Sequence, residues 1–319
     1  MKFLSRFLFI AAAAFLIIFV SGCNTKGGNQ LIDANKISNY SNKSNVVVVD
    51  MQKPEDYAKG HIKGSVNIPR DEIVINTPVE NMLAPKDQIE KVMGKNGISN
   101  NSTVLVYDNA NNMDAARFWW TMKVYGHENI KVVSGGYNAL KAAGDTFTEE
   151  ATKINLVSYT AKEANKDMIA SIEEVKKHVE SPQSNVVLLD TRTKEEYSQG
   201  AIPGSVLMDF MDNNYKNGSF KSAEAIKYQY VENKITKDKT VIMYCKTSVR
   251  AAETYLALYN AGYRNLKLYD GAWLEWSADK SLPVQNPSSS GVKTTEPGDK
   301  PANNAEPAKP VEPSSKDNS

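Results

Sequence analysis

Two short apolar runs, Val46-Val47-Val48-Val49-Asp50 and Val186-Val187-Leu188-Leu189-Asp190, lie about 140 residues apart and match almost position by position. Apolar residues at every position, rather than at alternate positions, are typical of parallel strands that helices cover on both faces. Each run ends in an aspartate, a residue that commonly organises the turn after a strand. The two runs therefore predict buried parallel strands in two related halves of the chain.

The similarity between the halves continues in the same order beyond these strands. Glu55-Asp56-Tyr57 and Gly60-His61-Ile62-Lys63-Gly64-Ser65 correspond to Glu195-Glu196-Tyr197 and Gly200-Ala201-Ile202-Pro203-Gly204-Ser205. Apolar strands alternate with helical segments in both copies, which indicates an α/β fold with a mostly parallel central sheet flanked by helices in each copy. We predict two tandem domains, at residues 31–145 and 168–285, and a polar linker at 146–167.

The N-terminal region of the 319-residue chain is basic and then wholly apolar from Phe7 to Val20. This stretch is short for a membrane span but suits the hydrophobic region of a signal peptide. Val20-Ser21-Gly22-Cys23 follows and resembles a bacterial lipobox, so we expect lipid on Cys23; an ordinary secretory signal with an incidental cysteine is the alternative. We therefore expect a signal peptide at 1–22, a tether at 23–30 and a lipid anchor that holds the protein on the extracytoplasmic side of the cell membrane.

The overall composition excludes several classes of partner. The net charge is +1 and no cluster of Lys and Arg stands out, so nucleic acid is not expected to bind. The three histidines are scattered and no metal-ligand motif is visible, so we expect no metal. Residues 286–319 are rich in Pro, Ser, Lys, Glu and Asn, which predicts a disordered tail. Two tandem domains can bury their cores without a partner, and we expect a monomer.

Cys23 and Cys245 are the only cysteines of the chain. Lipid on Cys23 would leave Cys245 unpaired, although exported proteins tend to pair their cysteines. Cys245 follows an apolar strand, Thr240 to Tyr244, and opens a short polar loop before a helix. Backbone N–H groups and the positive end of a helix dipole favour thiolate over thiol at such a position. The cysteine is therefore a candidate nucleophile; a small residue that fills space in the core is the alternative.

The duplicated motifs, the Cys245-x-x-x-x-Arg250 loop and Tyr269-Asp270-Gly271-Ala272-Trp273 together resemble the rhodanese family, specifically the tandem-domain sulfurtransferases. The resemblance covers roughly residues 31 to 285. It implies that Cys245 takes a sulfane sulfur from a donor such as thiosulfate and passes it to cyanide or a thiol, without a metal or organic cofactor. It also implies that the loop holds the transferred sulfur with backbone N–H groups; its residues are Lys246, Thr247, Ser248, Val249 and Arg250.

Positive side chains on this loop bear on the choice of donor. Lys246 and Arg250 favour the dianion thiosulfate over the singly charged 3-mercaptopyruvate, and a guanidinium suits bidentate binding of an oxyanion. The alternative is that Lys246 points to solvent and Arg250 pairs with a nearby carboxylate. The family pattern also places Arg192 near the loop, where a salt bridge to Glu195 or Glu196 is the alternative role.

The first copy departs from the catalytic pattern. Asp108 stands where the second copy has Cys245, and a carboxylate cannot carry sulfane sulfur. We therefore expect the first domain to be inactive and to build the interface and the mouth of the pocket. Two roles are open for Arg117, Phe118 and Trp119 on its next helix, facing that mouth or packing the helix, and packing is the favoured one. His61 has no evident partner and is expected to be structural or to face solvent rather than to be catalytic.

Two other functions remain open at this point. Cysteine phosphatases and arsenate reductases use a Cys-x-x-x-x-x-Arg loop, but only four residues separate Cys245 from Arg250, so the loop suits one sulfur atom better than a phosphate. A lipoprotein that uses the same fold only for binding or redox sensing is the second alternative, because fold alone does not give function. The intact Cys245 loop favours the enzyme, since a binding module would not need it.

Overall fold

The computed structural model describes residues 30–41 and 43–287. The expected signal peptide, Cys23, the tether before residue 30 and the tail from residue 288 lie outside the described residues. Within the two described ranges, no helix is both long enough and apolar enough to cross a membrane.

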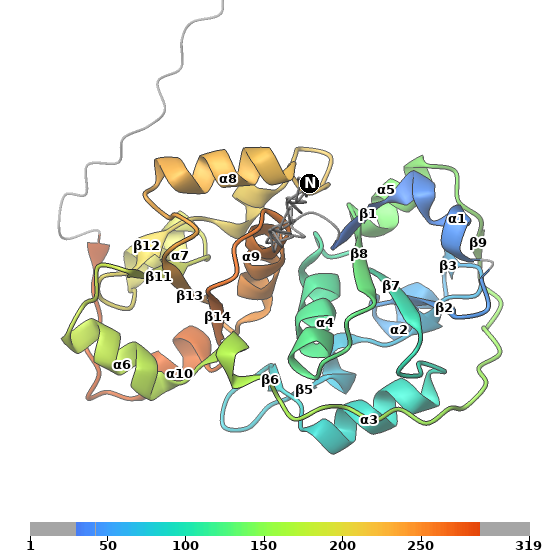
Figure 1. Cartoon of the computed structure of the whole chain (residues 1–319), viewed down its shortest axis with the longest axis horizontal. Coiled ribbons are helices and arrows are strands. Elements are labelled where there is room, and N and C mark those ends of the chain that lie inside the picture. The colour runs from blue at the N-terminus through green and yellow to red at the C-terminus, as the bar shows by residue number, and fades with distance from the viewer. Residues whose placement is uncertain (1–29, 42, 288–319) are drawn as a thin grey trace, which may run out of the picture.

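Two five-stranded sheets form the centres of two similar halves (Figure 1). The strands of the first sheet are β1 (Leu31–Asp33), β2 (Val46–Asp50), β4 (Val66–Asn67), β7 (Thr103–Tyr107) and β8 (Ile130–Ser134). Those of the second are β10 (Ile169–Ala170), β11 (Val186–Asp190), β12 (Val206–Leu207), β13 (Thr240–Tyr244) and β14 (Leu266–Tyr269). Their orders, β1-β8-β7-β2-β4 and β10-β14-β13-β11-β12, are the same, and every neighbouring pair is parallel. The predicted α/β fold with two parallel sheets is confirmed.

Helices cover the faces of both sheets. The first half contains α1 (Ser38–Ser41), α2 (Pro54–Tyr57), α3 (Lys86–Lys95), α4 (Met113–Val124), α5 (Gly136–Ala142), η1 (Ala34–Lys36) and η2 (Arg70–Glu72). The second contains α6 (Ile172–Glu180), α7 (Lys194–Gln199), α8 (Ala223–Glu232), α9 (Val249–Asn260), α10 (Ala272–Ala278), η3 (Lys166–Met168) and η4 (Phe210–Asn213). Two small antiparallel pairs join β3 (His61–Ile62) to β9 (Phe147–Thr148) and β5 (Val74–Ile75) to β6 (Met82–Leu83).

The central strands are buried because their apolar residues face helices on both sides. Val49 and Leu189, at matching positions of β2 and β11, have no exposed surface. In both halves the middle strand, β7 or β13, leads into the polar loop and pairs with β2 or β11, with Leu105 opposite Val48 and Ile242 opposite Leu188. This register brings the ends of β11 and β13 to the same edge of the sheet.

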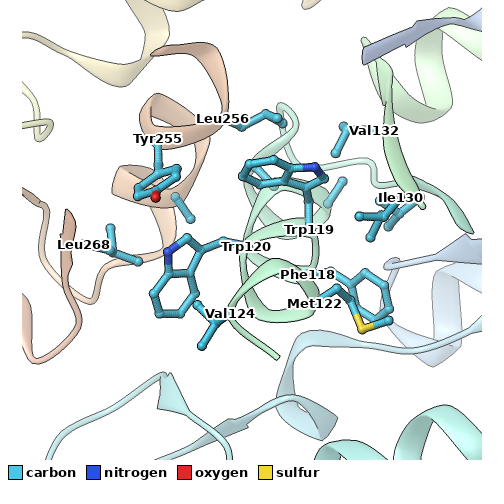
Figure 2. Packing of buried hydrophobic residues seen from close by; sticks show 14 of the residues in the cluster. Phe118, Trp119, Trp120, Met122, Val124, Ile130, Val132, Tyr255, Leu256 and Leu268 are labelled. Carbon is cyan, nitrogen blue, oxygen red and sulfur yellow. The ribbon is translucent and has the colours of Figure 1, made fainter. Parts of the chain in front are cut away.

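Helices α4 and α9 lie side by side at the centre of the molecule and join the halves (Figure 1). In Figure 2, Phe118 and Met122 of α4 point into the first half, whereas Trp120 points towards Tyr255 and Leu268 of the second. The ring of Trp119 lies 5.3 Å from that of Tyr259, in an edge-on contact. Buried aromatic surface of this kind stabilises an interface strongly. The predicted packing role of Phe118 and Trp119 is confirmed.

The chain between the halves is fastened to the first one. Strand β9 lies within the segment predicted as linker, and it pairs with β3 of the first half. Beyond it, the backbone N–H of Val157 donates to the carbonyl of Gly94 at 3.1 Å, and that of Lys162 donates to Tyr125 at 3.0 Å. A Cβ on Gly94 would lie 2.6 Å from the Val157 carbonyl oxygen, so only glycine permits this approach. The linker is therefore a strap that packs on α3.

Candidate active site

Cys245 lies at the junction between β13 and α9, at the edge of the second sheet where its parallel strands end. Its side chain is 1% exposed and forms no disulfide within the described part of the chain. Strand β13 is buried from Val241 to Tyr244, and this burial fixes where the loop begins. The predicted strand–loop–helix junction is present.

The loop after Cys245 alternates between solvent and interior. Lys246 is exposed, Thr247 and Arg250 are half-buried, and Ser248 and Val249 are buried. Helix α10 holds the start of the loop, because the N–H groups of Trp273 and Leu274 donate to the carbonyls of Cys245 and Lys246 at 3.0 and 3.2 Å. The carbonyls of Cys245 and Lys246 are thereby directed towards the start of α10.

Arg250 forms a paired contact with Glu196 of α7. Its Nη1 and Nη2 donate to the two carboxylate oxygens at 2.5 and 2.8 Å. Glu196 is also the third helical residue of a capping box with Thr193, so its position is set by the start of α7. The hydrogen bond from Arg250 lowers the pKa of Glu196. Of the two roles considered for Arg250, pairing with a carboxylate is the one that the structure has.

Arg192 pairs with Asp190, and the predicted alternative of a salt bridge to Glu195 or Glu196 is wrong. The guanidinium donates to Asp190 from Nε and Nη2, the latter at 2.7 Å, and also to the carbonyl of Gly200 at 2.7 Å. The backbone N–H of Arg192 bonds to the same carboxylate, so Asp190 organises the turn after β11, as predicted. The aspartate is nearer because it ends the strand two residues before Arg192.

In the first copy an uncharged side chain makes the contacts that Arg192 makes in the second. Gln52 occupies the position of Arg192, and its Nε2 donates to Asp50 at 2.9 Å and to the carbonyl of Gly60 at 3.3 Å. Both side chains therefore tie the strand end to the following loop. Arg192 differs in that its guanidinium lies 4.6 Å from the ring centre of Trp273.

A cavity of about 360 Å³ opens over the loop. Its lining residues are Arg192, Glu196, Gln199, Gly200, Lys246 and Trp273. Asp190 balances the charge of Arg192 in an ion pair, whereas none of the ion pairs among the described residues includes Lys246. Cys245 itself is not one of the lining residues, so the cavity offers a small anion a place beside Lys246, the residue that follows the cysteine, with Lys246 as an available cation.

In the first copy the corresponding loop surrounds the carboxylate of Asp108. Oδ1 of Asp108 accepts hydrogen bonds from the backbone N–H groups of Ala110 and Asn112 at 2.9 and 3.0 Å, and Oδ2 accepts one from Ala115 at 2.8 Å. Burial, reinforced by Asp114, raises the pKa of Asp108 to about 6, while the three N–H groups oppose the rise. Three backbone N–H groups of the loop therefore converge on the carboxylate oxygens of Asp108, an arrangement that suits an anion.

Arg117 contacts the Cys245 loop, although the sequence favoured a role in helix packing over one at the mouth of the pocket. It is fully buried, but it extends from α4 across the interface to Ser248 of the Cys245 loop. It also forms an ion pair with Asp270, which follows β14. A guanidinium in the otherwise apolar run Ala115 to Trp120 was the available signal, because buried arginine requires polar partners. His61, in contrast, is buried between backbone carbonyls of Tyr57 and Glu150, as expected of a structural residue.

The described residues contain no group of three or more His, Cys, Asp and Glu side chains that could hold a metal ion.

Comparisons with known proteins agree with this architecture. The family model for the rhodanese-like domain matches twice, at residues 33–143 and 171–279. A protein of Saccharopolyspora erythraea named "Putative thiosulfate sulfurtransferase" is 29% identical over 254 residues, which are 74% of this chain and 88% of that protein. The sulfur carrier protein TtuD of Thermus thermophilus is 28% identical over 246 residues, 72% of this chain and 86% of that one. The anaerobic ergothioneine biosynthesis enzyme from Chlorobium limicola shares the fold, with a TM-score of 0.72 at 20% identity over 81% of this chain and 70% of that one.

Proposed function

The chain belongs to the rhodanese family, with two copies of the domain in tandem, and we propose that it is a sulfurtransferase that carries sulfane sulfur on Cys245 and takes it from thiosulfate. Similarity to proteins named thiosulfate sulfurtransferase and sulfur carrier supports sulfur transfer as the reaction class. The first domain, with Asp108 in place of a nucleophile, has no part in the covalent chemistry.

The observation that carries the proposal is the carboxylate in the loop of the first copy. Counted from Cβ, an oxygen of Asp108 lies two bonds away, and the terminal sulfur of a persulfide on Cys245 would also lie two bonds away. Three backbone N–H groups hold the Asp108 oxygens. The equivalent loop of the second copy is one residue shorter between strand and helix, and it would hold a persulfide anion in the same manner.

The reaction then proceeds in two displacements. The Cys245 thiolate attacks the outer sulfur of thiosulfate, a new S–S bond forms, and the S–S bond of the donor breaks as sulfite leaves with its electron pair. The product is a persulfide anion on Cys245. Cyanide or a thiolate acceptor next attacks the terminal sulfur, and the original cysteine thiolate is released. No net oxidation of the protein occurs.

The charges around the cavity support thiosulfate as donor. Lys246 adds a positive charge to the lining of the cavity without an ion-pair partner among the described residues, and the guanidinium of Arg250 is held in its pair with Glu196. Burial disfavours the charged form of Arg250, but hydrogen bonds to Glu196 and the charge of Cys245 outweigh burial and raise its pKa. A donor with two negative charges gains more from Lys246 than 3-mercaptopyruvate with one, whereas Glu196 balances the charge of Arg250.

Mass spectrometry of the purified protein after exposure to thiosulfate tests the proposal. We expect the peptide that contains Cys245 to gain one sulfur atom, and we expect thiocyanate to form when cyanide is added. Cys245→Ser should abolish both, whereas Cys23→Ser should preserve both. Thiocyanate production by the Cys245→Ser variant at the wild-type rate would overturn the mechanism.

We further propose that Cys23 carries lipid and anchors the protein on the extracytoplasmic face of the cell membrane. The support is the sequence Val20-Ser21-Gly22-Cys23 after an apolar run. The same mass spectra test this, because cleavage before Cys23 and a lipid-sized increase in mass should appear together at the new N-terminus. An N-terminal peptide cleaved elsewhere and without lipid would refute the anchor.

A further inference from the structure

The loop that precedes α4 is linked to a side chain of α9, and the loop that precedes α9 is linked to a side chain of α4. Asn112 and Ser248 are the residues that precede α4 and α9, and both have left-handed backbones, with φ of 65° and 64°. Five residues after each, on matching turns of the two helices, lie Arg117 and Glu253. Both of these charged side chains are fully buried at the interface.

Each charged side chain is linked to the loop of the other half. Nη1 of Arg117 donates to Oγ of Ser248 at 3.0 Å. Glu253 accepts a hydrogen bond from Asn214 at 2.9 Å, and the side chain of Asn214 in turn accepts one from Asn112 at 3.1 Å. The loop with the nucleophile is therefore linked to a guanidinium, and the inactive loop is linked through an amide to a carboxyl group.

Ser248 has a conformation that glycine normally provides. A non-glycine residue with φ near 64° is strained and persists only where surrounding contacts enforce it. The hydroxyl of Ser248 is within 3.0 Å of both Arg117 Nη1 and Asp270 Oδ1, and Arg117 and Asp270 are themselves paired at 2.8 Å. The turn is therefore held from both sides, by Asp270 of its own domain and by Arg117 of the first domain.

The contacts of Arg117 leave it little freedom to move. Its Nη2 also donates to the carbonyl of Asn81 at 2.8 Å, and its guanidinium lies 4.6 Å from the ring centre of Trp120. Asp270 is fixed as well, since its second oxygen accepts the N–H of Leu83 at 2.7 Å. The first domain therefore presents a rigid donor to the turn three residues after Cys245.

We propose that Arg117 is a positioning residue for sulfur transfer: it fixes the left-handed turn at Ser248 and thereby sets the loop geometry that receives sulfur on Cys245. The inference rests on the proposed function of Cys245. It assigns the inactive domain a direct part in the reaction, because Arg117 belongs to that domain and bonds to the loop of the other. Arg117 is buried and lines no part of the cavity over the loop, so it acts through Ser248 and not through contact with the donor.

Four variants of the full-length protein separate this role from simple stability. Arg117→Met removes the guanidinium that donates to Ser248, and Arg117→Lys retains the positive charge but not the two-pronged guanidinium. Ser248→Gly removes the hydroxyl, allows the left-handed turn and leaves the Arg117–Asp270 ion pair in place. Arg70→Met is the matched control, since Arg70 pairs with Asp114 on the same helix α4 and does not contact the Cys245 loop. Urea unfolding of each variant verifies that it is folded.

The readout is the single-turnover rate at which thiosulfate loads sulfur onto Cys245, measured over a range of donor concentrations. For Arg117→Met and Ser248→Gly we expect the saturating rate to fall on the order of ten- to a hundred-fold, with a nearly unchanged half-saturating concentration, because a displaced loop misaligns the reacting atoms without removing a donor contact. Arg117→Lys should recover part of the rate, and Arg70→Met should match the wild type.

Two results would overturn the inference: an unchanged saturating rate in folded Arg117→Met or Ser248→Gly, or a loss confined to the half-saturating concentration. If Arg117→Met does not fold, Ser248→Gly decides, because it leaves the interdomain ion pair intact. If the wild type does not load sulfur at all, the proposed function has failed instead. In that case the rate at which iodoacetamide alkylates Cys245 reports on the loop geometry without any sulfur transfer. Equal alkylation rates in the wild type and Ser248→Gly would refute the positioning role.

Discussion

The pair between Glu196 and Arg250 offers the sharpest test of how the site selects its donor. Glu196 holds the guanidinium of Arg250 with two hydrogen bonds at 2.5 and 2.8 Å, and its carboxylate also lines the cavity. A negative charge at this position repels an incoming thiosulfate dianion. Glu196→Gln removes that charge while keeping an oxygen that can still accept from Arg250 and from the backbone of Thr193.

The size of the effect follows from Coulomb's law. One unit charge acting on a dianion at roughly 6–8 Å contributes about 1 kcal/mol in a dielectric close to that of water. This lower limit is the appropriate one because the Glu196 side chain is 31% exposed and solvent screens it. We therefore expect thiosulfate to load Cys245 about five- to ten-fold more efficiently in Glu196→Gln, measured as the second-order rate of loading at low salt. The loss of the ion pair should lower the free energy of unfolding by about 1 kcal/mol or less.

Two comparisons make this measurement specific. Glu195→Gln changes the net charge equally, but Glu195 is exposed on the same helix and forms no ion pair with Arg250, so its effect on loading should be small. The discharge of the persulfide by cyanide should change less than its loading, because cyanide carries one charge and thiosulfate two. A Glu196→Gln variant that loads sulfur no faster than the wild type, or one matched by Glu195→Gln, would show that Glu196 does not set the affinity for the donor.

Two further predictions concern the interface between the halves. Burial raises the pKa of Glu253 to about 8 from an ordinary value of 4.5, so the folded state binds a proton more tightly than the unfolded state. The free energy of unfolding should therefore decline by on the order of a few kcal/mol as the pH rises from about 5 to about 8, and then level off. Urea unfolding across this range should show that Glu253→Gln flattens the decline, and an identical slope in both proteins would contradict the assignment. Trp119→Ala removes a fully buried ring that contacts Tyr255 and Tyr259 across the interface, and it should cost about 3–5 kcal/mol; a loss below 1 kcal/mol in urea unfolding would mean that the interface repacks freely.

Parts of this protein could be predicted from the sequence because they depend on local patterns. The continuous apolar runs at Val46 and Val186 reflect strands covered on both faces, so they indicated the parallel sheets directly. The duplication placed Asp108 opposite Cys245, and it also identified which half lacks a nucleophile. The position of Cys245 between a strand and a helix required only the hydrophobic pattern on either side.

The partners of the charged side chains could not be predicted in this way, because they depend on which segments the fold brings together. A salt bridge to Glu195 or Glu196 was the alternative to a role of Arg192 near the loop, but the turn after β11 pairs Arg192 with Asp190, and Glu196 pairs with Arg250. The linker showed no hydrophobic pattern in the sequence. Its backbone N–H groups hold it on the first half, and such hydrogen bonds require no particular pattern of side chains.

The sequence by itself determined the fold class, the two copies and the single candidate nucleophile, because hydrophobic periodicity and residue identity are local properties of the chain. Only the tertiary structure decided that Arg117 of the inactive half bonds to Ser248 beside that nucleophile, 131 residues away. The packing of α4 against α9 creates this contact, and no spacing within either copy encodes it. The chemistry of Cys245 was visible in one copy of the motif, whereas the support of its loop requires both copies in contact.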